Sequence, residues 1–534
     1  MERLLQKTQS EGSFLCQLQD QDQEQDQEHE HDAIVLENVS YRYAGASKHA
    51  LDDVSLCIPQ GQCVVVTGPS GCGKTTLTRL VNGLVPLVYE GELEGCVLVE
   101  GRAVSSWTTA DLGTSVGSVF QNPRSQFVNI DTTSEIAFGC ENLGLPREEI
   151  IARVHEAVNA IGAQDLLDRS VEELSGGQRQ AVIIASALAM QPAVVVMDEP
   201  TASLDAAAMR RLANAICLLK QQGKTVVISE HRLWWLQGVV DRVIRMRDGR
   251  ICGDWSASDY EQISFAERVR FGERAWRLSE MEDGAQRGIT VEEAAPEMLK
   301  TQDLKAGYRR SRSVLKGVDL DIPAGKIVGI LGENGAGKTT LLRCLSGLTH
   351  EKDGTVFLEG KPLRFRKRPE AVHLVMQEPG YQLFADSVQG ELERAAVQSQ
   401  KQERRMSASG QDPSEQACAM LLRFGLDDLA DRHPLSLSGG ERQRLAIAAG
   451  VLQGARVVVL DEPTSGLDRR NMERVAAALR ALAAEGHAIC VVTHDYEFLC
   501  LVCDEVAELH AGKITDRYAL DSEGIGRARV FFGF

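Results

Sequence analysis

The chain has 534 residues, 43% of them hydrophobic, and a formal net charge of −18 at pH 7. Such a length can bury two or three ordinary hydrophobic cores, so two domains with tails are expected. The acidic balance argues against nucleic acid as a partner, because non-specific nucleic-acid binding usually needs a basic face. The N-terminal sequence MERLLQKTQS lacks the apolar core of a signal peptide.

The thirteen cysteines favour free thiols over a disulfide framework in a chain of this kind. Cys500 and Cys503 form a CxxC pair, but they lie in a long apolar stretch, which favours helix packing over a metal or redox site. Cys72 lies inside a glycine-rich loop, where we expect it to be open to oxidation or alkylation without being catalytic.

Residues 1–32 end in the acidic, glutamine-rich run QDQDQEQDQEHEHD. Such a run cannot bury enough apolar surface to become ordered, so a disordered tail is predicted. His29 and His31 fit a solvated tail better than a metal site.

Two domains are predicted from the pattern that follows the tail. The first covers residues 33–255 and the second 298–520. Residues 256–297 are charged and mostly polar and are predicted to form a linker, with a helix near 260–278. The short apolar C-terminal tail, 521–534, is expected to dock onto a neighbouring part of the molecule.

The most apolar window, residues 181–197, is interrupted by Gln191 and Pro192. A membrane-spanning helix needs about 20 apolar residues, so a helix followed by a buried strand is the better interpretation. Any membrane role is therefore expected to come through a partner.

Two glycine-rich loops each follow a short apolar strand and precede a helix that begins TTL. In such phosphate loops, glycines let backbone N–H groups face the phosphates at a helix N-terminus. Lys74 and Lys338 would neutralise β/γ-phosphate charge, and Thr75 and Thr339 would place a hydroxyl on Mg²⁺. The predicted nucleotide-contacting residues of the two loops are Gly68, Pro69, Ser70, Gly71, Cys72, Gly73, Lys74, Thr75, Thr76, Gly332, Glu333, Asn334, Gly335, Ala336, Gly337, Lys338, Thr339 and Thr340.

Two apolar runs, VVVM and VVVL, end in the acid pairs Asp198-Glu199 and Asp461-Glu462. This form is typical of a buried parallel strand that delivers acids at its carboxyl end. The first acid of each pair suits Mg²⁺ binding through water. The second is predicted to polarise a water that attacks the γ-phosphate.

A Ser-Gly-Gly motif opens a strong helix in each copy and offers a second anion-binding site. A lone motif of this kind would be an ordinary N-cap, but both copies place the serine 23 residues before the aspartate. All these motifs recur at an offset of 263 or 264 residues, which indicates a tandem duplication. The predicted residues are Ser175, Gly176, Gly177, Ser438, Gly439 and Gly440.

From about residue 33 to 520, the chain resembles a tandem pair of ABC-type nucleotide-binding domains. The resemblance implies an α/β fold with two P-loop NTPase domains, each with a RecA-like core, a helical subdomain and an antiparallel β subdomain. It also implies that the halves pair head to tail within the chain, so that ATP on one phosphate loop is capped by the Ser-Gly-Gly motif of the other half. The expected groupings are Lys74 and Glu199 with Ser438 and Gly440, and Lys338 and Glu462 with Ser175 and Gly177.

The same resemblance assigns His231 and His494 as switch histidines that contact the γ-phosphate and act with the catalytic glutamates. It assigns Gln121 and Gln377 as lid glutamines that contact nucleotide and metal. The implied cofactors are ATP and Mg²⁺. The full set expected at the metal is Thr75, Gln121, Asp198, Thr339, Gln377 and Asp461.

Adenine stacking is assigned to Tyr43 and Tyr308 by the resemblance, with Tyr41 as a competitor. Asp205 and Asp468 match the loop that crosses the interface between paired domains. No motif is degenerate, so two competent ATPase sites are expected.

The segments around the lid glutamines, VFQNPRSQF and VMQEPGYQLFADSV, resemble the ATPases of energy-coupling-factor importers for vitamins and transition-metal ions. Arg124 and Ser125 depart from that pattern. The resemblance implies integral membrane partners, an energy-coupling transmembrane protein and a substrate-capturing subunit, at the cytoplasmic face of a bacterial cell membrane. The copies diverge before the Ser-Gly-Gly motif, where residues 398–415 are interpreted as an insertion.

Two alternatives remain. An ABC-F type ribosome-associated translation factor is also a tandem pair, but such proteins usually carry a long, charged, helical linker. The second alternative is a fused ATPase of another ABC importer class, for sugars or peptides. The sugar type typically has an impaired second ATP site.

Overall fold

The computed structural model describes residues 32–202, 204–281, 296–307, 313–403 and 412–533. His29 and His31 of the predicted tail, Tyr308, and the middle of the predicted insertion lie outside these ranges.

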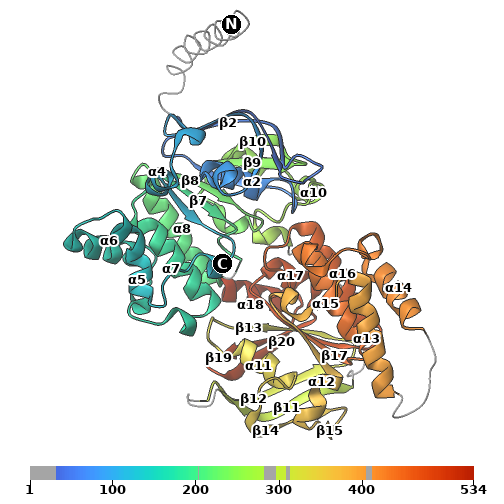
Figure 1. Ribbon diagram of the computed structural model, residues 1–534. Helices are drawn as coiled ribbons and strands as arrows, with labels where there is room; N and C mark the ends of the chain where they lie inside the picture. Colours follow the sequence, from blue (N-terminus) through green and yellow to red (C-terminus); the bar gives the residue numbers. More distant parts are fainter. Residues whose placement is uncertain (1–31, 203, 282–295, 308–312, 404–411, 534) are drawn as a thin grey trace, which may run out of the picture.

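In these described ranges, each half of the chain contains one four-stranded and one six-stranded sheet (Figure 1). The four-stranded sheets have the orders β2-β1-β4-β5 and β12-β11-β14-β15 and are antiparallel. The six-stranded sheets have the orders β10-β9-β3-β8-β7-β6 and β16-β17-β18-β13-β19-β20 and are parallel except for the hairpin at one edge.

The strands of the first half are β1 (Asp32–Tyr43), β2 (Leu51–Pro59), β3 (Cys63–Thr67), β4 (Gly91–Val99), β5 (Arg102–Ala103), β6 (Val116–Val119), β7 (Val194–Asp198), β8 (Thr225–Ser229), β9 (Arg242–Arg247) and β10 (Arg250–Ser256). Those of the second half are β11 (Glu297–Ala306), β12 (Leu315–Pro323), β13 (Ile327–Leu331), β14 (Glu351–Leu358), β15 (Lys361–Pro362), β16 (Val372–Val375), β17 (Val457–Asp461), β18 (Ala488–Val492), β19 (Glu505–His510) and β20 (Lys513–Ala519).

The sequence pattern explains which strand enters which sheet. The central strands β3, β7 and β8 are buried at every position, because both faces of a parallel sheet are covered. In β2 buried and partly or fully exposed residues alternate almost throughout, as in a sheet with one solvated face.

The helices of the first half are α2 (Lys74–Val81), α3 (Leu84–Leu87), α4 (Thr109–Ser115), α5 (Thr132–Asn142), α6 (Arg147–Ala160), α7 (Gly176–Ala189), α8 (Ala206–Gln221), α9 (Ala257–Gln262) and α10 (Phe265–Arg270). Those of the second are α11 (Lys338–Leu345), α12 (Arg368–Ala371), α13 (Val388–Glu403), α14 (Pro413–Phe424), α15 (Gly439–Leu452), α16 (Arg469–Ala484), α17 (Tyr496–Val502) and α18 (Ser522–Phe532). The 3₁₀ turns are η1 (Val104–Ser106), η2 (Pro123–Ser125), η3 (Gln164–Leu166), η4 (Val171–Glu173), η5 (Trp234–Leu236), η6 (Leu278–Met281), η7 (Phe365–Lys367), η8 (Pro379–Gln382), η9 (Asp427–Leu429) and η10 (Pro434–Ser436).

The predicted fold class is confirmed in both halves. Helices α5, α6 and α7 pack together as a helical unit beside the first mixed sheet, and α13, α14 and α15 do so beside the second. The apolar window of residues 181–197 is the end of α7 followed by β7, as predicted. Within the described residues, no helix is long and apolar enough to cross a membrane.

The connection between the halves, which we define as residues 257–281, differs from the single helix expected near 260–278. It contains two short helices, α9 and α10, and then the turn η6. Trp276, Leu278 and Met281 are buried, and η6 packs against α17 of the second half. This stretch is polar in overall composition, yet apolar side chains within it form a buried contact between the halves.

The C-terminal tail forms α18, which lies between the two halves (Figure 1). The ring of Phe532 packs edge-on against Tyr496 of α17, with centroids 5.5 Å apart. Arg210 of α8 donates a hydrogen bond to the carbonyl of Phe532 at 2.8 Å. In the same way Arg470 of α16 donates to the carbonyl of Arg270, at the end of α10, at 3.3 Å.

The three cysteines singled out in the sequence, Cys72, Cys500 and Cys503, are all buried. Cys500 and Cys503 form no disulfide and are buried at the end of α17, as packing residues. Cys72 is only 3% exposed, and burial raises the pKa of its thiol. The expectation that Cys72 is open to oxidation or alkylation is wrong, because the reactive thiolate is disfavoured there.

Candidate functional site

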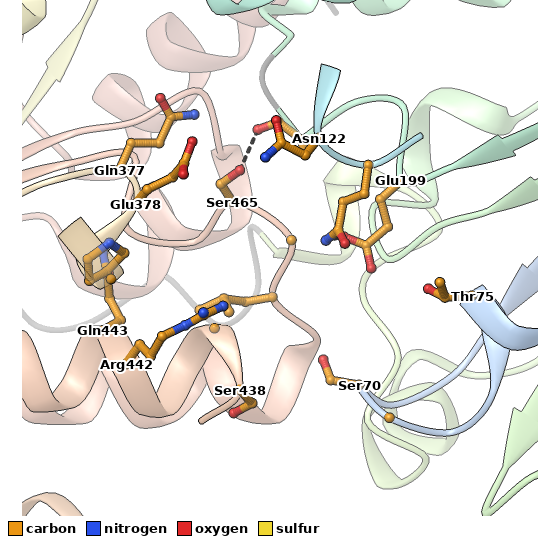
Figure 2. A pocket seen from close by; sticks show the side chains of 18 of the residues that line it. Ser70, Thr75, Asn122, Glu199, Gln377, Glu378, Ser438, Arg442, Gln443 and Ser465 are labelled. Atoms are coloured by element: carbon orange, nitrogen blue, oxygen red, sulfur yellow. Dashed lines mark hydrogen bonds between the residues drawn. The ribbon is translucent and has the colours of Figure 1, made fainter. Parts of the chain in front are cut away.

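Two cavities lie between the halves, each bounded by the phosphate loop of one half and the Ser-Gly-Gly motif of the other. The first has a volume of about 850 Å³, and Figure 2 shows Ser70, Thr75 and Glu199 facing Ser438 across it. The second has a volume of about 460 Å³. The head-to-tail pairing implied by the resemblance is therefore present in the structure.

Most of the predicted residues line these cavities. Those at the first cavity are Tyr43, Ser70, Gly71, Gly73, Lys74, Thr75, Thr76, Gln121, Glu199, Ser438 and Gly439. Those at the second are Ser175, Gly176, Gly177, Asn334, Gly335, Gly337, Lys338, Thr339, Thr340, Asp461 and His494, and both cavities include Gln377 and Glu462. The predicted residues that do not line either cavity are Gly68, Pro69, Cys72, Gly332, Glu333, Ala336, Asp198, His231 and Gly440.

The phosphate loops have the backbone that their glycines permit. Gly68 and Gly73 adopt φ of 143° and 108°, and a Cβ at Gly68 would lie 2.2 Å from the carbonyl oxygen of Met246. Only glycine fits there, since a side chain would collide with fixed backbone. The loop thus leads directly into α2, whose N-terminus has no side-chain cap and is suited to meet an anion.

The loop lysines are buried cations that fit a phosphate. Lys74 is 5% exposed, and its Nζ donates to the carbonyls of Gly68 and Pro69 at 2.9 and 3.2 Å. Lys338 donates to the carbonyls of Gly332 and Glu333 at 2.7 and 2.9 Å. Among the described residues, neither ammonium has a carboxylate within ion-pair distance. A buried cation without a paired anion is costly, so a bound phosphate would complete both sites.

Hydroxyl and carboxylate oxygens meet beside each loop. The hydroxyl of Thr75 donates to Asp198 at 3.3 Å, and that of Thr339 donates to Asp461 at 2.9 Å. Burial raises the pKa of both aspartates, because it removes water from the charged form. Oxygen donors of this kind are the ligands that Mg²⁺ prefers, so these four residues fit the metal. Gln121 instead donates from Nε2 to Glu199 at 2.7 Å.

The two glutamates are held by unusual backbone. Glu199 and Glu462 adopt φ of 46° and 49°, in the left-handed region that non-glycine residues rarely enter. Nε2 of His231 lies 3.3 Å from Oε1 of Glu199, and Nε2 of His494 lies 3.7 Å from Oε1 of Glu462. Strained backbone of this kind is concentrated at functional sites.

Burial shifts the pKa values of these glutamates and histidines in the direction that favours proton transfer. It raises the pKa of both glutamates, that of Glu462 to about 7. Burial and the nearby lysines lower the pKa of His231 and His494, so both rings are neutral near pH 7. A carboxylate poised near neutral pH can accept a proton from water.

The two halves contact each other through the loops that follow the glutamates. Asp468 accepts a hydrogen bond from the backbone N–H of Ser70 at 2.8 Å, and Asp205 accepts one from Asn334 at 3.4 Å. The hydroxyl of Ser465 donates to the carbonyl of Ala202 at 2.7 Å, which is the dashed bond in Figure 2. Each loop thus reaches the phosphate loop of the other half, as the resemblance implied for the two aspartates.

Of the two tyrosines considered for adenine stacking in the first half, Tyr43 lines the cavity and Tyr41 does not. Tyr43 lines the first cavity, and its hydroxyl is 3.2 Å from that of Thr76. Tyr41 is fully buried and donates to the carbonyl of Tyr89 at 2.8 Å, so it faces away from the cavity. Its expected counterpart Tyr308 lies in the part of the chain that is not described.

Gly466 is a site residue that motif reasoning missed. A Cβ built at this residue would lie 2.9 Å from Oε2 of Glu199 and 3.1 Å from Nε2 of Gln121. The loop of the second half therefore closes on the predicted catalytic carboxylate of the first. The signal was available, because the loop sequences TASLD and TSGLD differ at this position.

Residues 51–202 and 315–465 match the model of the ABC transporter family. The chain belongs to this family. Its two domains are ABC ATPase domains, which bind ATP, and such ATPases generally work with membrane components.

Relatives match over nearly the whole chain. A putative ABC transporter ATP-binding protein of Treponema denticola is 40% identical, over 90% of this chain and 96% of its own. A putative HMP/thiamine import ATP-binding protein, YkoD, of Bacillus subtilis is 29% identical, over 90% of each chain. A solved chain in a model of ribosome-bound archaeal Pelota and ABCE1 has a TM-score of 0.63 at 22% identity, over 92% of this chain and 80% of its own. That likeness shows the fold alone.

Proposed function

We propose that the chain is the ATP-hydrolysing subunit of a membrane importer of the energy-coupling-factor type, which takes up vitamins or transition-metal ions. The observation that carries the proposal is a pair of exposed apolar segments, one after each lid glutamine. Val128 and Ile130 are 66% and 74% exposed in the first half, and Tyr381 and Phe384 are 59% and 72% exposed in the second. Clustered exposed apolar side chains of this kind mark contact surfaces.

These segments are held in place by buried carboxylates. Glu135 is 3% exposed and accepts hydrogen bonds from the backbone of Val128 and Asn129 at 3.1 and 2.7 Å. Glu391 is 2% exposed and accepts one from Phe384 at 2.8 Å. A carboxylate that fixes exposed backbone pre-organises it for a partner, which lowers the entropy that docking costs.

The importer assignment is further supported by the relative named for HMP/thiamine import, which is similar over 90% of this chain. The expectation of two competent sites also favours it over fused sugar-import ATPases, since both halves have an aspartate, a glutamate and a histidine at their loops. The partners we propose are an energy-coupling transmembrane protein and a substrate-capturing subunit. They would hold the chain at the cytoplasmic face of the membrane.

The proposed chemistry is ATP hydrolysis at two composite sites. When bound, ATP with Mg²⁺ supplies the phosphoryl group and the charge that neutralises it. The loop lysines would hold the phosphates, and Thr75 with Asp198 and Thr339 with Asp461 would hold the metal. Glu199 and Glu462 would accept a proton from water, with the switch histidines orienting them. The Ser-Gly-Gly helix of the opposite half would cap each nucleotide, so hydrolysis would loosen the interface.

Affinity purification from membranes tests the proposal. We expect integral membrane proteins to co-purify with the chain and to be lost with Ile130→Asp and Phe384→Asp, because a buried charge opposes an apolar contact. The matched control is Leu348→Asp, since Leu348 is 60% exposed but lies outside both segments. Recovery of ribosomes in place of membrane proteins would instead support the translation-factor alternative and refute the proposal.

A further inference from the structure

A buried cluster of charged side chains lies between the halves, beside the second site. Each member is at most 5% exposed. Charged groups are almost never buried so completely unless they are paired, so the pairing decides their positions. The members are Arg232, Arg274, Arg469, Asp495 and Glu497.

Arg274 is the central cation of this cluster. It belongs to the connection, beyond α10, and its Nη2 contacts both carboxylate oxygens of Asp495. Its Nε lies 3.1 Å from Oε1 of Glu497, and the N–H of Ala275 donates to the same carboxylate at 3.1 Å. Arg469 approaches Glu497 at 3.3 Å. The connection is therefore fastened to the N-terminal turn of α17.

Asp495 links that cation to the second site. It directly follows His494, whose backbone N–H donates to Glu462 at 3.0 Å. Thr464, two residues after Glu462, donates its hydroxyl to Asp495 at 2.8 Å. One carboxylate, held by Arg274, thus joins the segment that carries the histidine to the segment that carries the glutamate.

The first site has a different arrangement. There Thr201, the equivalent of Thr464, donates to Glu230, which precedes His231. The position after His231 is Arg232, whose Nη2 lies 3.9 Å from Asp495. The first half therefore supplies its own carboxylate beside its own histidine. Among the described residues, Arg274 makes no hydrogen bond or ion pair with that carboxylate, although its charge acts on Glu230 and His231 through space.

We propose that Arg274 is a positioning residue for the second ATP site: by holding Asp495 it fixes His494 and Glu462, whereas it has no direct contact with the carboxylate beside His231 at the first site. The inference rests on the proposed ATP hydrolysis at both sites. Through its direct contacts, the connection between the halves supports the second site more than the first.

Site-resolved turnover tests the inference in the otherwise unmodified full chain. Vanadate trapping of photoreactive 8-azido-ATP reports hydrolysis, and mass spectrometry of the labelled peptides assigns it to either half. For Arg274→Ala we expect labelling of the second half to fall at least fivefold relative to the first, with KM for ATP changed less than twofold. Arg274→Lys should restore part of the lost labelling, because lysine keeps the positive charge but cannot contact Asp495 and Glu497 as the guanidinium does.

A matched control comes from the same segment. Arg268 is fully buried and pairs with Glu280, and its hydrogen bonds stay within the connection. Arg268→Ala should weaken folding without shifting the ratio of labelling between halves. An equal loss of labelling at both halves in Arg274→Ala would overturn the inference. If the alanine variant does not fold, an unchanged ratio of labelling between the halves in Arg274→Lys would overturn it. Absence of trapping in the parent chain would instead refute ATP hydrolysis.

Discussion

Replacing Gly450 by alanine should destabilise the second half, although alanine is the better helix former. Gly450 lies within α15, and a Cβ there would meet the His373 ring at 2.2 Å from Cδ2 and 2.3 Å from Cγ. Overpacking of this kind costs about 1–3 kcal/mol, and such short contacts place it at the upper end. The higher helix propensity of alanine offsets about 1 kcal/mol of this cost. The net expectation is a loss of about 2 kcal/mol.

Differential scanning calorimetry measures this change. A loss of about 2 kcal/mol lowers the melting temperature of a domain of 150–250 residues by roughly 4–8 °C. The first half provides the reference, because it has Ala187 and Gly117 at the equivalent positions. Combining Gly450→Ala with His373→Gly recreates that pair and should recover at least half of the loss. An unchanged or raised melting temperature for Gly450→Ala would refute the reasoning.

The same histidine predicts an acid dependence. Burial lowers the pKa of His373 from 6.5 to about 4. The unfolded chain therefore binds a proton between these values while the folded chain does not. The stability due to the neutral ring is complete above pH 6.5, falls as the pH drops, and has lost about 3 kcal/mol by pH 4. His373→Gly should remove this component, and a pH-stability slope identical to that of the parent chain would contradict it.

Three further predictions concern the two sites. Glu199→Gln and Glu462→Gln should each lower ATPase activity about 100-fold or more while ATP binding persists, and full activity in either variant would disprove two working sites. Gly466→Ala should impair the first site selectively in the trapping assay, since its Cβ would lie 2.9 Å from Glu199; equal labelling of both halves would contradict this. Cys72 should resist iodoacetamide in the folded chain and react only on unfolding, as followed by mass spectrometry, and rapid labelling of the native chain would contradict its burial.

Much of the site could be predicted because its chemistry is local in sequence. A phosphate loop needs glycines at fixed positions, and an acid at the end of a buried strand needs only the apolar run before it. Arg274 could not be found in this way, because its partner Asp495 is 221 residues away and no periodic pattern links them. The burial of the connection could not be predicted either, since charges that make its sequence look solvated neutralise one another, as in the pair of Arg268 and Glu280.

Helices α8 and α16 each combine two contacts described above. Asp205, at the start of α8, reaches the opposite phosphate loop, and Arg210, one turn later, holds the end of α18. In α16 the same roles fall to Asp468 and Arg470. Opening the cavities would therefore break the contacts of the two aspartates, while the connection keeps both halves in one chain. Even in the open state, each half would meet the other at the high effective concentration of a tethered partner, so re-closure would not depend on protein concentration.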